Sequence, residues 1–158
     1  MEPERNRFLV DSMLGRLVKW LRVMGYDTNY QTFYKVGIIG PLIHGGRLLL
    51  SRHRPTVDKY PNSLLILSDK VQGQLEEIRA QGYLTLDNAR WFTRCLTCNT
   101  LLIEAAVEDA REKIPEYVFY QNITTGLRFC RSCGRFFWPG SHRRRMITQL
   151  EEWGFKYN

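Results

Sequence analysis

The sequence contains no long apolar run. Nowhere does it approach the roughly 18 consecutive apolar residues that a membrane-spanning helix needs. The first residues, MEPERNR, are charged and polar, and they lack the apolar segment of a secretory signal. Low-complexity segments are missing too, and so are internal repeats other than two cysteine pairs. We therefore expect a cytoplasmic protein without a membrane partner, in which the cysteines stay reduced.

Acidic residues are scarce relative to basic ones. The chain has 158 residues, with 16 Asp and Glu against 23 Lys and Arg, and its formal net charge is +7 at pH 7. Hydrophobic residues make up 44% and charged residues 25%, which is typical of a folded chain and argues against intrinsic disorder. The length suits one ordinary domain with a small additional module. The basic surplus favours a polyanionic partner such as RNA.

The first part of the chain alternates short strand-like and helix-like segments. Apolar runs predict buried strands at 7–11, 47–51 and 64–68, and segment 26–31 is also strand-like. Helical spacing predicts helices at 12–25 and 69–82, the second with Asp69 near its start and Gln72 in a capping box. Glycines and a proline leave segment 35–46 ambiguous. This order predicts an α/β domain over residues 1–90, with a small parallel sheet flanked by helices.

The second part of the chain, residues 91–158, has a different character. It contains all four cysteines, and short strand-like segments at 117–122 and 135–138. A helix is predicted at 107–114, and another at 141–155 with Ser141 as its cap. We therefore expect a small module of short strands that carries a C-terminal helix.

Two C-x-x-C pairs, Cys95 with Cys98 and Cys130 with Cys133, predict a zinc site in this module. A two-residue gap lets both thiolates of one turn reach a single tetrahedral ion, and two such turns complete the four ligands. Four sulfur ligands leave no open position, so the zinc would be structural. The 31 residues between the pairs exceed the usual spacing and leave room for an inserted helix and strand. The alternative is two unrelated pairs or a redox dithiol.

Arginines cluster around the second cysteine pair. Between Gly126 and Met146 there are six arginines and no Asp or Glu, and four aromatic residues, Phe129, Phe136, Phe137 and Trp138, interleave with them. Guanidinium groups bind phosphates and aromatic rings stack on unpaired bases, so this segment predicts an RNA surface. Alternatively, the aromatic rings fill the core of the module and the arginines are merely solvated. The six arginines are Arg128, Arg131, Arg135, Arg143, Arg144 and Arg145.

A lone carboxylate, Asp11, ends the first predicted strand and precedes a basic helix. It could cap that helix, because Asp is favoured just before a first helical turn. It could also be a metal ligand at the carboxyl edge of a parallel sheet, where open α/β folds place their sites. Further basic residues near this strand and the third one join the predicted RNA-binding set: Arg16, Lys19, Arg22, Arg52 and Arg54.

Several motifs together resemble the Mut-seven C-terminal RNase-type family. They are FLVDSMLGRLVKWLRVMGYDT, RLLLSRHR, RCLTCNTLL, IPEYV and CRSCGRFFWPGSHRRRM, and the resemblance covers about residues 7–146. It implies a PIN-like fold followed by a zinc ribbon. It also implies metal-dependent RNA cleavage by carboxylates that hold divalent ions at the carboxyl ends of the strands.

The resemblance assigns a reduced catalytic site to this chain. Asp11 matches the first carboxylate of the family and Asp69 matches a later acidic position. The segment FYKVGIIGPL lacks the acidic residues usual there, and Ser51-Arg52-His53 stands where the family has an Asp. With His53 as a third ligand, the site favours Mn²⁺ over Mg²⁺. Alternatively, the basic side chains around His53 fill the metal space and leave the site inactive.

These patterns predict a metal-dependent ribonuclease with a reduced carboxylate site. Two alternatives stay open. One is a catalytically inactive RNA-binding protein associated with ribosomes or tRNA. The other is a zinc-ribbon module that binds other proteins. RNA is the expected partner in the first two cases, whereas the sequence names no protein partner.

Overall fold

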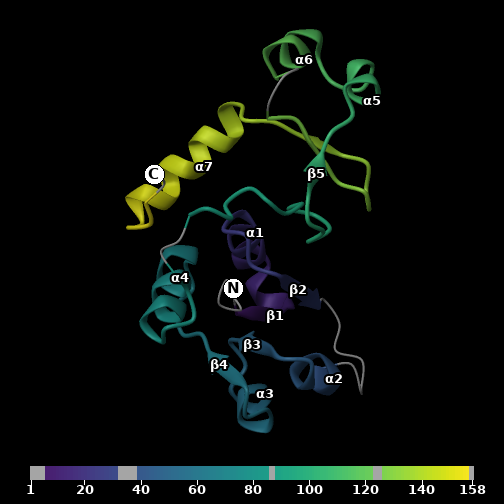
Figure 1. The fold of residues 1–158 in the computed structure, drawn as a ribbon. Coiled ribbons are helices and arrows are strands. Elements are labelled where there is room, and N and C mark those ends of the chain that lie inside the picture. Colours follow the sequence, from purple (N-terminus) through teal and green to yellow (C-terminus); the bar gives the residue numbers. More distant parts are fainter. Residues whose placement is uncertain (1–5, 32–38, 86–87, 123–125, 157–158) are drawn as a thin grey trace. The chain divides into compact units, whose positions relative to one another are not determined.

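The computed structural model describes residues 6–31, 39–85, 88–122 and 126–156. The chain divides into two compact units, Met1–Phe92 and Thr93–Asn158. Figure 1 shows the elements of each unit, and each unit is described by itself below.

The first unit is built on four parallel strands. They are β1 (Arg7–Asp11), β2 (Thr28–Gln31), β3 (Arg47–Ser51) and β4 (Ser63–Leu65), in the spatial order β2-β1-β3-β4. In the register, Val10 pairs with Tyr30 on one side and with Leu50 on the other. The two central strands are buried along nearly their whole length, because their apolar residues face helices on both sides of the sheet. The predicted small parallel sheet is confirmed, although β4 is shorter than expected.

Five helical segments accompany this sheet: η1 (Ser12–Leu14, a 3₁₀ turn), α1 (Gly15–Val23), α2 (Ile39–His44), α3 (Arg54–Lys59) and α4 (Val71–Ala80). The apolar face predicted for the first helix is confirmed, since Leu17, Val18 and Leu21 are buried. The ambiguous segment forms α2 after residues 35–38, which lie outside the described residues. Its Pro41 lies in the first turn, where the missing N–H is not needed. The sequence did not predict α3.

The predicted capping box of α4 is wrong. The helix begins at Val71, its N-cap is Lys70, and no side chain caps it. The loop before it is held from the helix interior, because the Glu77 carboxylate accepts hydrogen bonds from the N–H groups of Leu67 and Ser68 at 2.9 and 3.0 Å. Glu77 therefore satisfies two N–H groups of the loop, whereas Asp69 and Gln72 were expected to satisfy N–H groups at the start of the helix.

Arg22 joins α1 to β2. It is only 8% exposed, and its Nε and Nη2 atoms donate to the carbonyl oxygen of Thr28 at 3.2 and 3.0 Å. A buried guanidinium is stable only where such acceptors surround it. Arg22 was predicted to contact RNA, but its burial assigns it to the fold.

The second unit combines a three-stranded antiparallel sheet with three helices. The strands are β5 (Ile103–Glu104), β6 (Arg128–Phe129) and β7 (Phe136–Phe137), and the helices are α5 (Val107–Arg111), α6 (Glu116–Asn122) and α7 (Ser141–Glu152). The helix predicted at 107–114 and the strand predicted at 135–138 are confirmed in shorter form. Ser141 is the first helical residue rather than the cap, since the N-cap is Gly140.

The strand predicted at 117–122 is wrong, because this segment forms α6. Ala110, Ile114 and Val118 recur every four residues, and with Phe119 and Leu127 they form one buried cluster. Ala110 lies on α5, Ile114 lies between the two helices and Val118 lies on α6, so packing of α5 against α6 decides against the β-prone tyrosines and phenylalanine. Phe136 and Trp138 pack against the same cluster. For these two aromatic residues, the structure therefore favours a role in the core of the unit.

No helix within the described part of the chain is long and apolar enough to cross a membrane.

Gly25 should be hard to replace, because it follows α1 with a φ of +86° and an added Cβ would clash with the backbone carbonyl of Arg90. We predict that Gly25→Ala lowers the free energy of unfolding by about 2–4 kcal/mol, through the unfavourable φ together with the clash. Gly82→Ala is a matched control, since Gly82 has a φ of +82° but open space around it. It should cost only about 1 kcal/mol. Urea denaturation measures both, and equal losses would contradict the predicted clash.

Candidate functional site

The two cysteine pairs lie on two turns with the same backbone hydrogen bonds. In the first turn the N–H of Asn99 donates to the carbonyl of Cys95 at 2.9 Å, and in the second the N–H of Gly134 donates to that of Cys130 at 2.8 Å. Asn99 and Gly134 both have positive φ, of 66° and 76°. Asn and Gly are the residues that best tolerate this conformation, which explains their presence at the same place in both turns.

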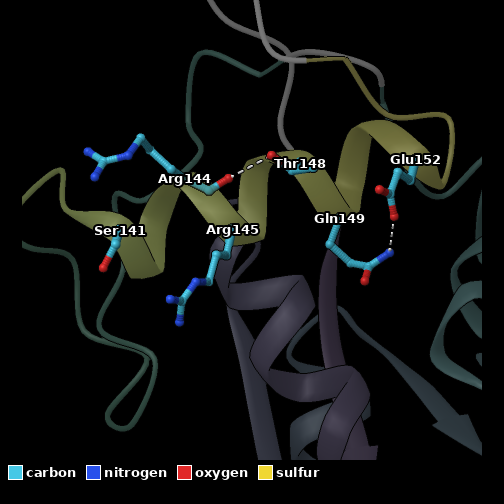
Figure 2. Close-up of a pocket in the computed structure, with 6 residues that line it drawn as sticks. All are labelled: Ser141, Arg144, Arg145, Thr148, Gln149 and Glu152. Carbon is cyan, nitrogen blue, oxygen red and sulfur yellow. Dashed lines mark hydrogen bonds between the residues drawn. The ribbon is translucent and has the colours of Figure 1, made fainter.

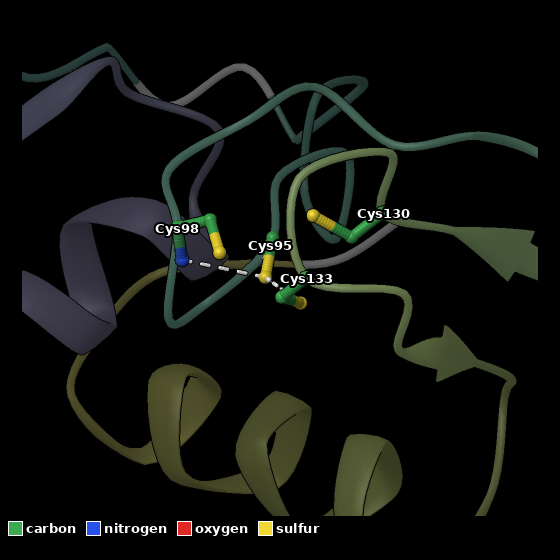
Figure 3. A group of neighbouring side chains, drawn as sticks. All are labelled: Cys95, Cys98, Cys130 and Cys133. Atoms are coloured by element: carbon green, nitrogen blue, oxygen red, sulfur yellow. Dashed lines mark hydrogen bonds between the residues drawn. The ribbon is translucent and has the colours of Figure 1, made fainter.

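The four thiols converge on one point (Figure 3). Their sulfur atoms all lie within 4.8 Å of one another, and the Sγ atoms of Cys95 and Cys133 are 3.8 Å apart. A tetrahedral ion with Zn–S bonds of about 2.3 Å requires sulfur atoms about 3.8 Å apart. Cys95 and Cys130 are fully buried, whereas Cys133 is exposed. The residues present therefore fit a metal ion such as zinc.

Side-chain contacts between the turns hold this arrangement together. The Thr100 and Ser132 hydroxyl groups are 2.7 Å apart and hydrogen bonded, and the Arg135 guanidinium donates to the Thr97 hydroxyl. Each contact joins one cysteine turn to the other. These contacts help to position the four thiols without an ion.

The thiols have unlike proton affinities in the absence of an ion. Burial raises the pKa of Cys95, and hydrogen bonding to Cys133 raises the pKa of Cys98 to about 12. Burial also opposes ionisation of Cys130, but the backbone N–H groups of Cys133 and Ser132 outweigh it and lower its pKa to about 7. A metal ion must therefore displace protons from this cluster, and the affinity for the ion must fall as the pH falls.

A second candidate site lies at the carboxyl edge of the parallel sheet. Chain order reverses direction between β1 and β3, which makes this the switch point where open α/β sheets bind ligands. Asp11 ends β1 there and is 1% exposed. Its Oδ1 accepts the N–H of Met13 at 3.0 Å, and its Oδ2 accepts the hydroxyl of Ser51, which ends β3. Asp11 thus caps η1 and also lies where an edge ligand lies.

His53 and Asp69 are placed differently. The N–H of His53 donates to Ser51 Oγ at 3.0 Å, so His53 is tied to Asp11 through one hydroxyl, while its exposed ring bonds Thr56 through Nδ1 at 2.8 Å. Asp69 is exposed in the loop after β4. Within the described residues, the cysteines are the only group of three or more His, Cys, Asp or Glu side chains that converges as metal ligands do. Ser51 was not among the predicted site residues, because only the β1–β3 register brings it to Asp11.

Most of the predicted RNA-binding side chains are on the surface. Arg52 is half-buried and donates to the carbonyl of Leu67 at 3.2 Å, and Arg143 is also half-buried. In the described part of the chain, Arg144 and Arg145 form no ion pair. The exposed members of the set are Arg16, Lys19, Arg54, Arg128, Arg131, Arg135, Arg144 and Arg145.

A shallow pocket of about 360 Å³ opens along α7. Figure 2 shows that the guanidinium groups of Arg144 and Arg145 extend away from the helix axis, while the Gln149 side-chain amide donates to the Glu152 carboxylate at 3.2 Å. The pocket is polar and cationic at its N-terminal end, which suits an anionic group. Its lining consists of Ser141, Arg144, Arg145, Thr148, Gln149 and Glu152.

Comparison with protein families gives a match over nearly the whole chain. The model of the Mut7-C RNAse domain matches residues 6–150, which include both cysteine pairs and the whole parallel sheet. The chain belongs to the Mut7-C RNAse domain family. Comparisons with curated proteins and with solved structures return no match. The family resemblance read from the sequence motifs is thus confirmed, and membership suggests a nuclease-like role for this Mut7-C chain.

We predict that the purified Mut7-C chain carries one zinc ion and that Cys130→Ser loses it and unfolds the second unit, because the ion contributes folding energy to the unit that binds it. Arg131→Ala is the matched control, since Arg131 lies in the same turn, is exposed and supplies no thiol. Elemental analysis and circular dichroism measure the outcome. Zinc uptake should release protons and weaken from pH 8 to pH 6. Full zinc retention by Cys130→Ser would contradict the proposed ligand set.

Proposed function

We propose that the protein binds RNA through the arginines of its second unit. The observation that carries this proposal is a segment, residues 126–146, with six arginines and no acidic residue, most of them exposed. Guanidinium groups bind phosphate oxygens in pairs of parallel hydrogen bonds, which makes an exposed arginine cluster a phosphate-binding surface. Membership of an RNAse domain family supports RNA as the polyanion.

The arginines are held by three different elements of the second unit. Arg128 lies on β6, Arg131 and Arg135 flank Cys133, and the other three lie in the first turns of α7. The α7 N-terminus carries partial positive charge of its own, and no acidic residue occupies its first turn. Placing three arginines there is unfavourable for the helix alone, so an external anion would relieve the repulsion.

We also propose a division of roles between the two units. A nuclease-type domain spans about residues 1–90 and a zinc ribbon with α7 follows, as the sequence motifs imply. Arg16 and Lys19 on α1, with Arg52 and Arg54 after β3, remain the candidates for RNA contact on the first unit. We propose a cytoplasmic location as well, because four unpaired thiols in one cluster suit a reducing compartment.

We predict that Arg143→Ala, Arg144→Ala and Arg145→Ala together weaken RNA binding and flatten its salt dependence. Losing three phosphate contacts lowers the slope of log K against log salt by roughly 2 for a single strand. The control replaces three exposed lysines, Lys59, Lys70 and Lys113, with Ala, which removes the same charge outside the cluster. Anisotropy titrations of a labelled RNA at several salt concentrations give both slopes. Equal slopes for the two triple variants would place the RNA elsewhere.

A second candidate function is RNA cleavage at Asp11. The observation that favours it is the buried Asp11 carboxylate, held by Ser51 and Met13 at the switch point of a nuclease-family sheet. Such a carboxylate has a fixed position, which ligand binding requires. Each of its oxygens accepts one hydrogen bond from these partners, so each retains a lone pair.

The described residues fit a divalent ion only if RNA and water complete its ligands. The first unit supplies one buried carboxylate, Asp11, while His53 and Asp69 are exposed. Mg²⁺ is often bound through one or two carboxylates plus phosphates and waters. When bound, the ion would polarise the phosphate and activate a water. Asp11 would hold the ion, Ser51 would orient Asp11, and the nitrogen of His53 favours Mn²⁺.

We predict slow RNA cleavage that Mn²⁺ supports better than Mg²⁺. Asp11→Asn should lower the rate at least about 100-fold and leave RNA affinity nearly unchanged, because the carboxylate acts on the chemistry rather than on RNA binding. Asp58→Asn is the control, since Asp58 is an exposed carboxylate on α3. Gel assays with equal amounts of folded protein measure the rates. If the parent protein cuts no RNA with either metal, RNA binding without cleavage is the function; if Asp11→Asn cuts as fast as the parent, the active centre lies elsewhere.

A further inference from the structure

The helix α6 presents two tyrosines to solvent. Tyr117 is 67% exposed and Tyr120 is 62% exposed, whereas Val118 and Phe119 between them are buried. Residues three and four apart are neighbours on a helix, so Tyr117 and Tyr120 adjoin each other, and Glu116 adjoins Tyr120. We name Glu116, Tyr117 and Tyr120 the tyrosine face. None of the three belongs to the cysteine cluster or to the buried cluster, and of the three the Tyr120 ring makes an edge contact with Phe119, at 5.4 Å between ring centres.

Acidic residues are frequent on the helix that neighbours the tyrosine face. Figure 1 shows α5 beside α6, and the two share the buried cluster of Ala110, Val118 and Phe119. The Arg111 guanidinium lies 5.4 Å from the centre of the Phe119 ring and also joins the two helices. Val107 on α5 is 39% exposed. The exposed carboxylates on or next to this short helix are Glu104, Glu108, Asp109 and Glu112.

The charges of the second unit are divided between two segments. Five of its seven acidic residues lie at positions 104–116, with only Arg111 and Lys113 among them, and the remaining two are Glu151 and Glu152. The six arginines of the proposed RNA surface all lie at 128–145. Carboxylates repel phosphates, so RNA bound to the arginines is not attracted to the tyrosine face. The α5–α6 insertion therefore has a different ligand chemistry from the rest of the unit.

We propose that the tyrosine face and the carboxylates of α5 form a docking surface for a lysine- and arginine-rich segment of a partner protein. Tyrosine is enriched at protein interfaces because it offers a large apolar ring with a polar end. A cationic side chain also binds favourably over an aromatic ring. The carboxylates complement the same cations through charge-assisted hydrogen bonds. This inference is independent of the proposed RNA function, because it uses none of the same residues.

The test uses the full-length, zinc-loaded protein and defined probes. A fluorescent peptide that alternates Lys or Arg with Leu is titrated by anisotropy, beside a peptide with Glu in place of the cations. A single-stranded RNA is titrated in parallel. We expect the basic peptide to bind, with an affinity that falls as salt rises, and the acidic peptide not to bind.

Two double variants locate the binding surface. Tyr117→Ala with Tyr120→Ala should weaken binding of the basic peptide at least about tenfold, as expected for aromatic residues at the centre of an interface. Glu108→Gln with Glu116→Gln should weaken binding of the basic peptide and flatten the salt dependence of its affinity. Glu151→Gln with Glu152→Gln removes the same charge from α7 and should change neither quantity. All four replaced residues of the proposed surface are exposed, so zinc content and circular dichroism should match the parent.

Four results would overturn the proposal. In the first, the basic peptide fails to bind. In the second, Glu151→Gln with Glu152→Gln weakens peptide binding as much as Glu108→Gln with Glu116→Gln does. The tyrosine variant loses RNA affinity while peptide affinity is unchanged, which would make this face a base-stacking surface. Or the tyrosine variant abolishes self-association of the protein without affecting the peptide, which would make a second copy the occupant. If the tyrosine variant fails to fold, the peptide affinities of the two glutamate variants still show whether the peptide binds at α5 and α6.

Discussion

The convergence of four thiols on one point is the constraint on which the second unit depends. Its three strands contain two residues each, and its buried apolar cluster is small. A metal ion held by the four thiols would add folding free energy to a unit with so small a buried cluster. The elements β5, α5, α6 and β6 lie between the two turns in the chain, so the meeting of the turns brings the two ends of this segment together.

The elements that could be predicted from sequence are those with a local cause. The strands β1 and β3 follow from apolar runs that are buried on both faces, and α1 follows from its helical spacing. Segment 117–122 was mistaken for a strand because its residues are β-prone, whereas its packing against Leu127 is a long-range effect. The loop before α4 was also unpredictable, because Glu77, from within the helix, holds Leu67 and Ser68.

In the candidate sites, too, features with a local cause could be predicted and features that depend on long-range contacts could not. The cysteine cluster was predictable because each C-x-x-C pair is a local turn, and only the meeting of the two turns required the fold. Asp11 was placed by the family motif, but its bond to Ser51 depends on the register between β1 and β3. Arg22 was placed with the surface cations because its charge was visible in the sequence, while the Thr28 carbonyl that binds it was not.

The equivalence of the two cysteine turns has a consequence for the balance of charge. Zn²⁺ bound by four thiolates carries a net formal charge of two negative units. The backbones of the turns match, but their intervening residues do not: Leu96 and Thr97 occupy one, Arg131 and Ser132 the other. Positive charge near the thiols comes from both turns, because Arg94 precedes the first turn and donates to its Asn99 carbonyl at 2.9 Å, while Arg131 and Arg135 lie in and after the second. With zinc bound, part of that charge would neutralise the metal centre, and the arginines of α7 would form the larger share left for an external anion.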